Sequence, residues 1–389
     1  MTEERGVTMI GTLPPLKGIS PYCLKLAQGI AQRIEVRFIS FSRLYPSFAY
    51  PGGKVEGSDV EPSSQELRNI RVRRSISYLN PFSWISAGIT PKTRLVHLQW
   101  WSLPLAPVYL VILALLKIRK KTVLLTVHNV VPHEKRLMNR WLSWAIFLFA
   151  DHFVVHTENN RQRLSQLFSI SAERIEVIHH PVLDIYQAPS ESQASIRRRL
   201  EIPSDAATIL FFGNIRHYKG LDILIRALPE ILKAVPKAHL VVAGQSWEDW
   251  DMTYGQLVRS LGVSGSVTAY SDYVPTSDVG RFFSASDIVV LPYRNFEAQS
   301  GVGNIALAFA APLIVTNVGG LGELVEDPRA ICPPNDSEAL AKVVKTVLLD
   351  SEWRAKLISD AKKLKERYSW KNAAKRTIDL YRQLSKRDG

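Results

Sequence analysis

Residues 286–323 read SDIVVLPYRNFEAQSGVGNIALAFAAPLIVTNVGGLGE and decide how the rest of the chain is interpreted. The pattern predicts a buried strand, a loop of small residues, a short apolar helix, a second strand and a loop with two adjacent glycines. In a parallel α/β sheet, backbone N–H groups and a helix N-terminus gather at the carboxyl ends of the strands, where they bind phosphate. Glu297 directly precedes the small-residue loop. We therefore expect a site for a nucleotide attached to a group with hydroxyls, such as a sugar.

Apolar, β-branched runs alternate with helical patterns along the whole chain, which predicts parallel sheets covered by helices on both faces. At 389 residues the chain exceeds one ordinary core, and the strand count exceeds one open sheet. The predicted strands are Val7–Thr12, Ile34–Phe41, Leu95–Gln99, Thr122–His128, His152–His156, Ile175–Ile178, Thr208–Phe212, His239–Ala243, Ser266–Tyr270, Ile288–Leu291 and Leu313–Thr316. We expect two doubly wound, Rossmann-like α/β domains, residues 1–182 and 183–368, that face each other across a ligand-binding cleft.

Several segments between these strands have other signatures. Helical patterns include Tyr22–Gln32, Asn160–Phe168, Asp222–Lys233, Trp250–Leu261, Ser351–Tyr368 and Lys371–Lys386. The polar stretch 183–195 contains a proline and is typical of a linker. The region Ser42–Asn80 is rich in Pro, Gly, Ser and charge, which predicts a long loop, either functional or a solvated insertion.

Composition narrows the function class. The chain is 46% hydrophobic and 22% charged, with a formal net charge of +13 that favours anionic partners, although a basic surface alone also explains it. Its two cysteines, Cys23 and Cys332, match no metal spacing and no disulfide framework. The N-terminus lacks a signal-peptide pattern, and the apolar run Leu103–Leu116 is too short to span a membrane. We expect a cytoplasmic protein, at the inner face of the membrane if its apolar helices dock there.

A basic loop follows the first strand of the second domain. The strand runs into Gly213, and Arg216 and Lys219 precede a helix that is expected to start near Leu221. Two cations at the carboxyl end of a strand can stabilise the charge that develops on a departing diphosphate. A solvated basic loop is the alternative interpretation.

In the first domain, a histidine and a glycine-containing loop also follow predicted strands. His128 follows an apolar strand, so its imidazole can bind a sugar hydroxyl or stabilise a developing oxocarbenium ion, unless it is a structural histidine. His133 and Glu134 are weaker candidates, and Pro132 excludes a helical zinc motif. Gly18, between the first strand and first helix, permits close approach of backbone to a phosphate.

Aromatic and apolar segments suggest acceptor and membrane contacts. Trp100 and Trp101 end a strand, where they form either a platform for a sugar ring or, more simply, part of the core. Leu103–Leu116, followed by the basic residues 117–121, and Trp141–Phe149 are typical of interfacial helices, although a doubly wound fold also requires buried apolar helices.

Taken together, these motifs resemble the retaining GT-B glycosyltransferases of family 4 (glycosyl transferases group 1), over nearly the whole chain. That family has a Glu-x7-Glu motif, a small-residue helix, a proline, a strand and a Val-Gly-Gly-x-x-Glu motif; Glu297 falls on the first Glu, and the later positions are Pro312, Asn317, Gly319, Gly320 and Glu323. The resemblance implies catalytic roles for His128, Arg216, Lys219 and Glu297, and donor-binding roles for Gly18, Gly213, Asn214, Gln299, Ser300, Gly301, Val302 and Glu323. His156-Thr-Glu158, His180-Pro181 and the ending Tyr368-Ser-Trp370 with Tyr381 match as well. In GT-B proteins the last helix, here residues 369–389, crosses back to the first domain.

Two positions depart from the family pattern. Ile305 replaces the second Glu, which usually binds the ribose, as in a branch with a Gln-Ser-Gly-Val loop. Ribose recognition then falls to Glu323 or a backbone group. Asn214 stands at the usual Arg position, and Arg216 is the expected substitute.

The resemblance implies retaining transfer of a hexose from a UDP- or GDP-sugar to a carbohydrate or lipid-linked acceptor, in glycan, polysaccharide or glycolipid biosynthesis. We expect no metal, because fixed cations and a helix dipole can neutralise the leaving group and no acidic metal-ligand pair stands out. The rival hypotheses are another GT-B enzyme, such as an epimerase or phosphorylase, and a non-catalytic nucleotide-sugar-binding protein. No nucleic-acid-binding module supports the basic charge as a nucleic-acid site.

Overall fold

The chain divides into two compact α/β units. A computed structural model describes residues 6–16, 18–44, 61–130, 137–183, 186, 188–296 and 299–387. Unit 1 consists of Met1–His179 and Trp370–Gly389, and unit 2 of His180–Ser369. The boundaries expected from the sequence lay at 182/183 and 368/369.

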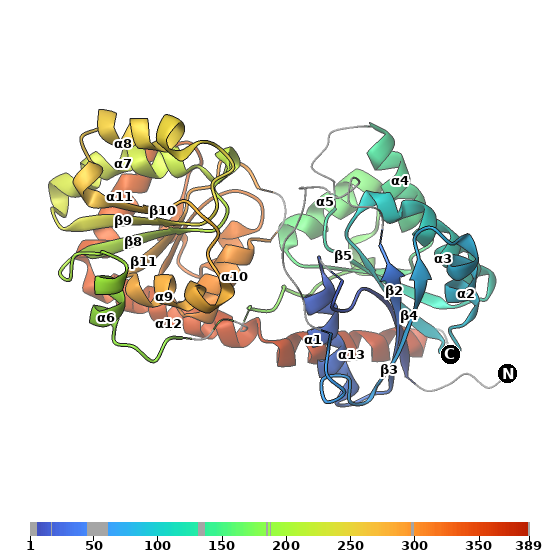
Figure 1. Cartoon of the computed structure of the whole chain (residues 1–389). Coiled ribbons are helices and arrows are strands. Elements are labelled where there is room, and N and C mark those ends of the chain that lie inside the picture. The colour runs from blue at the N-terminus through green and yellow to red at the C-terminus, as the bar shows by residue number, and fades with distance from the viewer. Residues whose placement is uncertain are drawn as a thin grey trace. The chain divides into compact units, whose positions relative to one another are not determined.

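Unit 1 is built on a seven-stranded sheet of order β3-β2-β1-β4-β5-β6-β7, in which all neighbouring strands are parallel. Its strands are β1 Val7–Gly11, β2 Val36–Arg43, β3 Ile70–Ser77, β4 Leu95–Trp100, β5 Thr122–Val127, β6 His152–Val155 and β7 Ile175–Val177. Its helices are α1 Ser20–Ala31, α2 Pro81–Ile89, α3 Ala106–Ile118, α4 Leu137–Phe147, α5 Glu158–Phe168 and α13 Trp370–Arg387 (Figure 1). The strand order reverses between β1 and β4, so the loops after these strands diverge and leave a ligand-sized crevice in folds of this type.

The prediction of a long loop over Ser42–Asn80 is wrong for its last part, because Ile70–Ser77 forms the edge strand β3. Ile70 and Ile76 are buried, while arginines occupy positions between them. An edge strand needs only one neighbour and tolerates charge, which also discourages pairing with other chains. Residues 45–60 of this region lie outside the described part of the chain.

The last helix, α13, packs against α1 within unit 1 (Figure 1). A Cβ atom on Gly29 of α1 would lie 2.7 Å from Cβ of Ala374, so glycine permits this close approach. Trp370 contacts Tyr22, and Tyr381 and Leu384 are buried in the same apolar cluster as β1 and α1. The amphipathic last helix therefore completes the core of the first unit.

Unit 2 contains a six-stranded sheet of order β10-β9-β8-β11-β12-β13, again with parallel neighbours. Its strands are β8 Ala207–Phe212, β9 Ala238–Ala243, β10 Val267–Tyr270, β11 Ile288–Leu291, β12 Leu313–Thr316 and β13 Ile331–Cys332. Its α-helices are α6 Gln193–Arg199, α7 Leu221–Ala234, α8 Gln256–Ser260, α9 Thr276–Ala285, α10 Gly301–Ala308, α11 Ser337–Leu349 and α12 Ser351–Arg367. The order reverses between β8 and β11, which are adjacent in the sheet although β9 and β10 lie between them in the sequence.

Candidate functional site

The loops after β8 and β11 meet at this reversal in unit 2 and are fastened to each other. The backbone N–H of Arg294 donates to the carbonyl oxygen of Tyr218 at 2.8 Å, and the Arg294 guanidinium pairs with Asp222 at the start of α7. Gly220 has a φ of +68°, and a Cβ atom there would overlap the carbonyl oxygen of Pro292. Because of this contact, only glycine fits between the two loops.

Two predicted donor-binding residues, Gly213 and Val302, and the predicted catalytic residue Lys219 converge on one point of this site. A Cβ atom built on Gly213 would lie 3.0 Å from Nζ of Lys219 and 2.8 Å from Cγ2 of Val302. Gly213 directly follows β8, Lys219 lies in the 3-10 turn His217–Lys219, and Val302 belongs to the first turn of α10. The structure therefore brings the cation and the first turn of α10 to the same point beside the glycine.

Lys219 is a buried cation. Its side chain is mostly removed from water, with a residue exposure of 7%, and its Nζ lies 5.8 Å from the centre of the Tyr293 ring. Burial, and secondarily the charge of Arg216, lowers the pKa of Lys219 to about 8. No carboxylate among the described residues forms an ion pair with it. A buried ammonium ion without a counter-charge favours an anionic ligand.

Arg216 is positioned by a tryptophan that sequence reasoning missed. Its guanidinium carbon lies 3.6 Å from the centre of the Trp247 ring, and its Nε is buried without a hydrogen-bond partner. Trp247 follows β9, the strand next to β8, and the pairing of Ile215 with Ser246 holds the two loops together. The sequence signal was available, since Gly244-Gln245-Ser246-Trp247 follows a predicted strand in the same way as Gly213 does.

The N-terminus of α10 carries further unpaired polar atoms. Oγ of Ser300 caps the helix by accepting from the N–H of Gly303 at 3.2 Å, which leaves the earlier N–H groups of the helix without an acceptor inside it. Oε1 of Gln299 accepts from the N–H of His180 at 3.1 Å, but its Nε2 has no partner, and neither has Oδ1 of the buried Asn304. Ile305 is 5% exposed and packs in the core, so it offers nothing to a ribose.

Three further predicted site residues of unit 2 are Asn214, Glu323 and Glu297. Asn214 is exposed in the loop after β8. Glu323 is half-buried in the turn Leu321–Leu324 after β12, and its carbonyl oxygen accepts from Oη of Tyr368 at 3.0 Å. Glu297 falls outside the described residues, so its proposed role stays a prediction.

In unit 1, the loops after β1 and β4 bring Gly18 close to Trp101. A Cβ atom on Gly18, whose φ is +87°, would lie 3.9 Å from Nε1 of Trp101. Trp101 is half-buried, with its ring edge-on to Phe41. Trp100 is instead 2% exposed and packs edge-on against Tyr109 at 5.4 Å. Both tryptophans contact Tyr109, but only the half-buried Trp101, just beyond the end of β4, keeps surface for a ligand, so the two-tryptophan platform is reduced to Trp101.

His128 lies where expected, after β5, but its ring is held by the protein. Nε2 of His128 is 2.9 Å from Oε1 of Gln99, and Nδ1 is 3.2 Å from Nε2 of His156. Nδ1 of His156 is 2.8 Å from the carbonyl oxygen of Ile178. A sugar hydroxyl that bound this ring would have to displace Gln99 or His156. His133 and Glu134 lie outside the described residues.

A buried polar chain continues behind His128. Nε2 of Gln99 lies 3.1 Å from Nε2 of His97, whose Nδ1 is 2.6 Å from Oη of Tyr381 on α13. Burial lowers the pKa of His97 to about 3, so its imidazole is neutral at physiological pH. The last helix is thereby connected to the strand end that carries His128.

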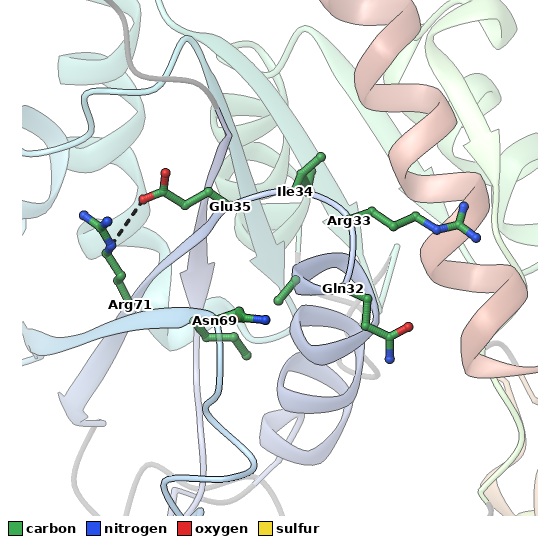
Figure 2. A pocket seen from close by; sticks show the side chains of 8 residues that line it. Gln32, Arg33, Ile34, Glu35, Asn69 and Arg71 are labelled. Carbon is green, nitrogen blue, oxygen red and sulfur yellow. Dashed lines mark ion pairs between the residues drawn. The ribbon is translucent and has the colours of Figure 1, made fainter.

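Unit 1 also contains a hollow of about 540 Å³, which does not lie at the carboxyl ends of its strands. It is lined by residues 31–35, which lie before β2, and by residues 69–71, where β3 begins, so it lies at the amino ends of these strands (Figure 2). Figure 2 shows Glu35 and Arg71 paired, and their Oε1 and Nε atoms are 3.3 Å apart. Because it lies away from the carboxyl ends of the strands, where ligands of such sheets bind, we do not assign it as the ligand site. In the described part of the chain, no three His, Cys, Asp or Glu side chains are grouped to hold a metal ion.

Comparison with known proteins finds two family models that match the chain, each over less than half of its length. Residues 16–183 match the Glycosyltransferase Family 4 model and residues 192–364 match the model for glycosyl transferases group 1. A D-inositol 3-phosphate glycosyltransferase of Nocardioides is 29% identical over 60% of this chain and 54% of its own. An uncharacterised glycosyltransferase of Methanocaldococcus jannaschii is 30% identical over 57% of each chain. The chain thus spans a little over half the length of these curated relatives.

Solved structures share the fold over nearly the full length. HepE of Anabaena, solved in complex with UDP, has a TM-score of 0.72 and 15% identity, covering 97% of this chain and 100% of its own. The sucrose-phosphate synthase of Thermosynechococcus elongatus has a TM-score of 0.68 and 18% identity, covering 98% and 99%. The expectation of a GT-B, α/β fold with two doubly wound parallel-sheet domains is confirmed. The chain combines a Glycosyltransferase Family 4 domain with a glycosyl transferases group 1 domain.

Proposed function

We propose that the protein is a retaining glycosyltransferase that moves a hexose from a UDP- or GDP-sugar to an acceptor hydroxyl. The observation that carries the proposal is the convergence of Gly213, Lys219 and the α10 N-terminus at the strand reversal of unit 2. HepE, whose fold this chain shares, is solved with UDP and with UDP-glucose. A nucleotide diphosphate sugar is therefore the ligand we assign to these loops.

Bond breaking at the anomeric carbon leaves negative charge on the diphosphate, and this site supplies fixed positive charge for it. Lys219 contributes a buried ammonium ion, Arg216 a guanidinium held on Trp247, and α10 the positive end of its dipole. We assign Glu297 to the sugar hydroxyls, with Gln299, Ser300, Gly301 and Val302 contributing the loop that receives the sugar and diphosphate. These charges can act without a resident metal.

The retaining outcome is supported by the composition of the first domain. The described residues of the loops after β1, β4 and β5 contain no Asp or Glu that could act as a nucleophile, and Glu134, in the loop after β5, lies outside the described residues. We propose that the leaving phosphate takes the acceptor proton and that the acceptor attacks on the same face of the sugar. Trp101 and the His128 segment are assigned to the acceptor side.

The acceptor we propose is a carbohydrate or lipid-linked sugar, in polysaccharide or glycolipid biosynthesis, with the protein working in the cytoplasm and associating peripherally with the membrane. No helix in the described ranges has the length and apolarity needed to cross a bilayer. Both described cysteines are free and buried, which suits a reducing compartment.

One observation favours a second candidate. Ile305 is buried where the family pattern places a carboxylate, so the chain can alternatively bind a nucleotide sugar without transferring it. A transfer or hydrolysis assay separates the two candidates. A protein that only binds the nucleotide sugar is stabilised against heat by the nucleotide but never releases UDP or GDP from the sugar. An epimerase or phosphorylase would produce an epimer, or a sugar phosphate when orthophosphate is present.

The test is a thermal-shift panel of UDP, GDP and their hexose conjugates, followed by analysis of the product anomer by NMR. We expect one nucleotide to raise the melting temperature selectively, and the transferred sugar to keep the configuration of the donor. No shift with any nucleotide would contradict the donor site, while an inverted product would contradict only the retaining mode.

A further inference from the structure

A second hollow in unit 1, of about 910 Å³, is cationic. It lies at the amino ends of β4, β5 and β6, so it is on the edge of the sheet opposite to His128 and Trp101. Its described lining residues include one carboxylate, Asp151, and five cations: Arg94, Lys117, Lys120, Lys121 and Arg174. We call this the cationic hollow.

The protein itself fixes several of these cations. Nζ of Lys117 pairs with Asp151 at 2.5 Å, and the Arg174 guanidinium donates to the carbonyl oxygens of Ala150 and Asp151. Nζ of Lys121 donates to the carbonyl oxygen of Lys92 at 3.3 Å. One carboxylate cannot neutralise five cations, so the hollow keeps an excess of positive charge while its walls are held in place.

Exposed aliphatic side chains surround the cationic hollow. Ile89, Ile118 and Leu148 stand at the ends of α2, α3 and α4 with exposures of 51%, 76% and 58%. Each helix returns from the carboxyl end of one strand to the amino end of the next, which brings these three ends to the edge that contains the hollow. The Arg119 guanidinium contacts the carbonyl oxygen of Ile89, and Leu148 itself lines the hollow.

The apolar surface continues along α4. Trp144 precedes Leu148 by one helical turn and is 42% exposed, and Trp141 lies one turn earlier with 66% exposure. Their rings pack edge-on at 5.8 Å. Exposed aliphatic and tryptophan side chains beside a cluster of Lys and Arg are what an anionic lipid surface binds, since the apolar groups enter the acyl boundary and the cations meet phosphate.

We propose that this edge of unit 1 docks on an anionic membrane, with lipid phosphate headgroups in the cationic hollow and Ile118, Leu148 and Trp144 in the interface. This specifies the surface for the peripheral association included in the proposed function, but it does not depend on sugar transfer. Because the hollow lies opposite the carboxyl-end loops of unit 1, docking leaves those loops directed away from the lipid.

The test is co-sedimentation with vesicles of phosphatidylcholine alone or mixed with phosphatidylglycerol. We expect binding only to the mixed vesicles, weakened by added salt. Lys120→Asp reverses a charge at a position with φ +54°, which Asp tolerates better than most residues, and should weaken vesicle binding about tenfold or more. Ile118→Ser should weaken it severalfold while leaving the charge unchanged.

The matched control is Lys362→Asp, which makes the same charge change on an exposed residue of α12 in unit 2. It should alter vesicle binding less than about twofold. UDP binding is measured for every variant, so that loss of folding or of the donor site is distinguished from loss of docking. Equal effects of Lys120→Asp and Lys362→Asp, or binding unaffected by Ile118→Ser, would overturn the proposal.

A second arm separates lipid from water-soluble phosphate. Calorimetric titration of glycerol 3-phosphate into the wild type should detect no binding that is lost in Lys120→Asp. The isolated headgroup lacks the apolar part of the interaction. Tight binding of glycerol 3-phosphate with no vesicle binding would assign the hollow to a soluble phosphate ester and contradict membrane docking.

Discussion

The loops at the strand reversals of the two sheets occupy equivalent positions, but they differ in how many of their buried polar atoms have hydrogen-bond partners. In unit 2, Arg216, Gln299 and Asn304 each keep a buried polar atom without a partner, beside a buried lysine. In unit 1, both ring nitrogens of His128 are held by Gln99 and His156, and Oγ1 of Thr12, directly after β1, is the buried polar atom of these loops without a partner among the described residues. Unpaired buried polar groups destabilise a protein unless a ligand satisfies them. The difference indicates that unit 2 is prepared for a charged ligand, whereas unit 1 presents a preformed, mostly satisfied surface.

The largest expected effect is a difference in stability between variants of two adjacent tryptophans of unit 1. Trp100→Ala should lower the free energy of unfolding by about 3–5 kcal/mol, because it empties a buried site against Tyr109. Trp101→Ala should cost less stability and instead raise the KM for the acceptor. Chemical denaturation and steady-state kinetics of both variants measure this, and similar stability losses with an unchanged acceptor KM would remove Trp101 from the acceptor side.

In unit 2, Lys219→Ala should reduce kcat by about 10²–10³, the loss typical of removing one group that stabilises transition-state charge. Lys342→Ala, on the exposed face of α11, is the matched control and should leave kcat unchanged. Turnover of the Lys219 variant at saturating donor is the measurement. If it equals that of the control, the buried lysine does not assist the leaving group.

Two glycines of the same site test where the ligand lies. Gly301→Ala places a methyl group where no atom lies within 4 Å, so it should preserve or slightly raise stability and still weaken UDP binding about tenfold. Gly213→Ala should weaken binding too but also cost about 1–3 kcal/mol of stability, because its φ is +92° and the methyl would meet Val302. Unchanged UDP affinity in Gly301→Ala would show that the ligand does not approach the α10 N-terminus.

The pKa of Lys219 predicts a smaller, pH-dependent effect. Its ammonium form is present below the folded pKa of about 8, so kcat/KM should fall as pH rises through that value, and Lys219→Arg should not show this fall. Because the unfolded lysine titrates near 10.5, the unfolded chain binds more protons between about pH 8 and 10.5. This lysine therefore makes the free energy of unfolding rise with pH over that window. A flat kcat/KM profile between pH 7 and 9 in the wild type would contradict the assignment.

The sequence predicted most of the fold because the strands are short apolar runs bounded by turn residues, such as Ile288–Leu291 and Leu313–Thr316, whose observed bounds are identical. It missed Ile70–Ser77, since an edge strand with arginines lacks a continuous apolar run. The predicted helix Trp250–Leu261 begins as a π-helical turn, Asp251–Gly255, before α8. Periodicity does not distinguish these hydrogen-bonding patterns.

The site was predicted only in part, for a similar reason. Residues after strands, such as Gly213 and Lys219, could be placed because strand ends gather at one edge. The stacking of Arg216 on Trp247 and the clamp on His128 depend on side-chain packing between strands that are distant in sequence. Trp100 and Trp101 could not be separated from the sequence either, because their different burial depends on the packing around the end of β4.

The most direct test of the account is calorimetric titration of UDP and GDP into the wild type, Lys219→Ala and Lys342→Ala at neutral pH. We expect that one nucleotide binds the wild type and Lys342→Ala alike, and binds Lys219→Ala at least about tenfold more weakly. Equal affinity of all three proteins, or no binding of either nucleotide to the wild type, would contradict a diphosphate site at the strand reversal of unit 2.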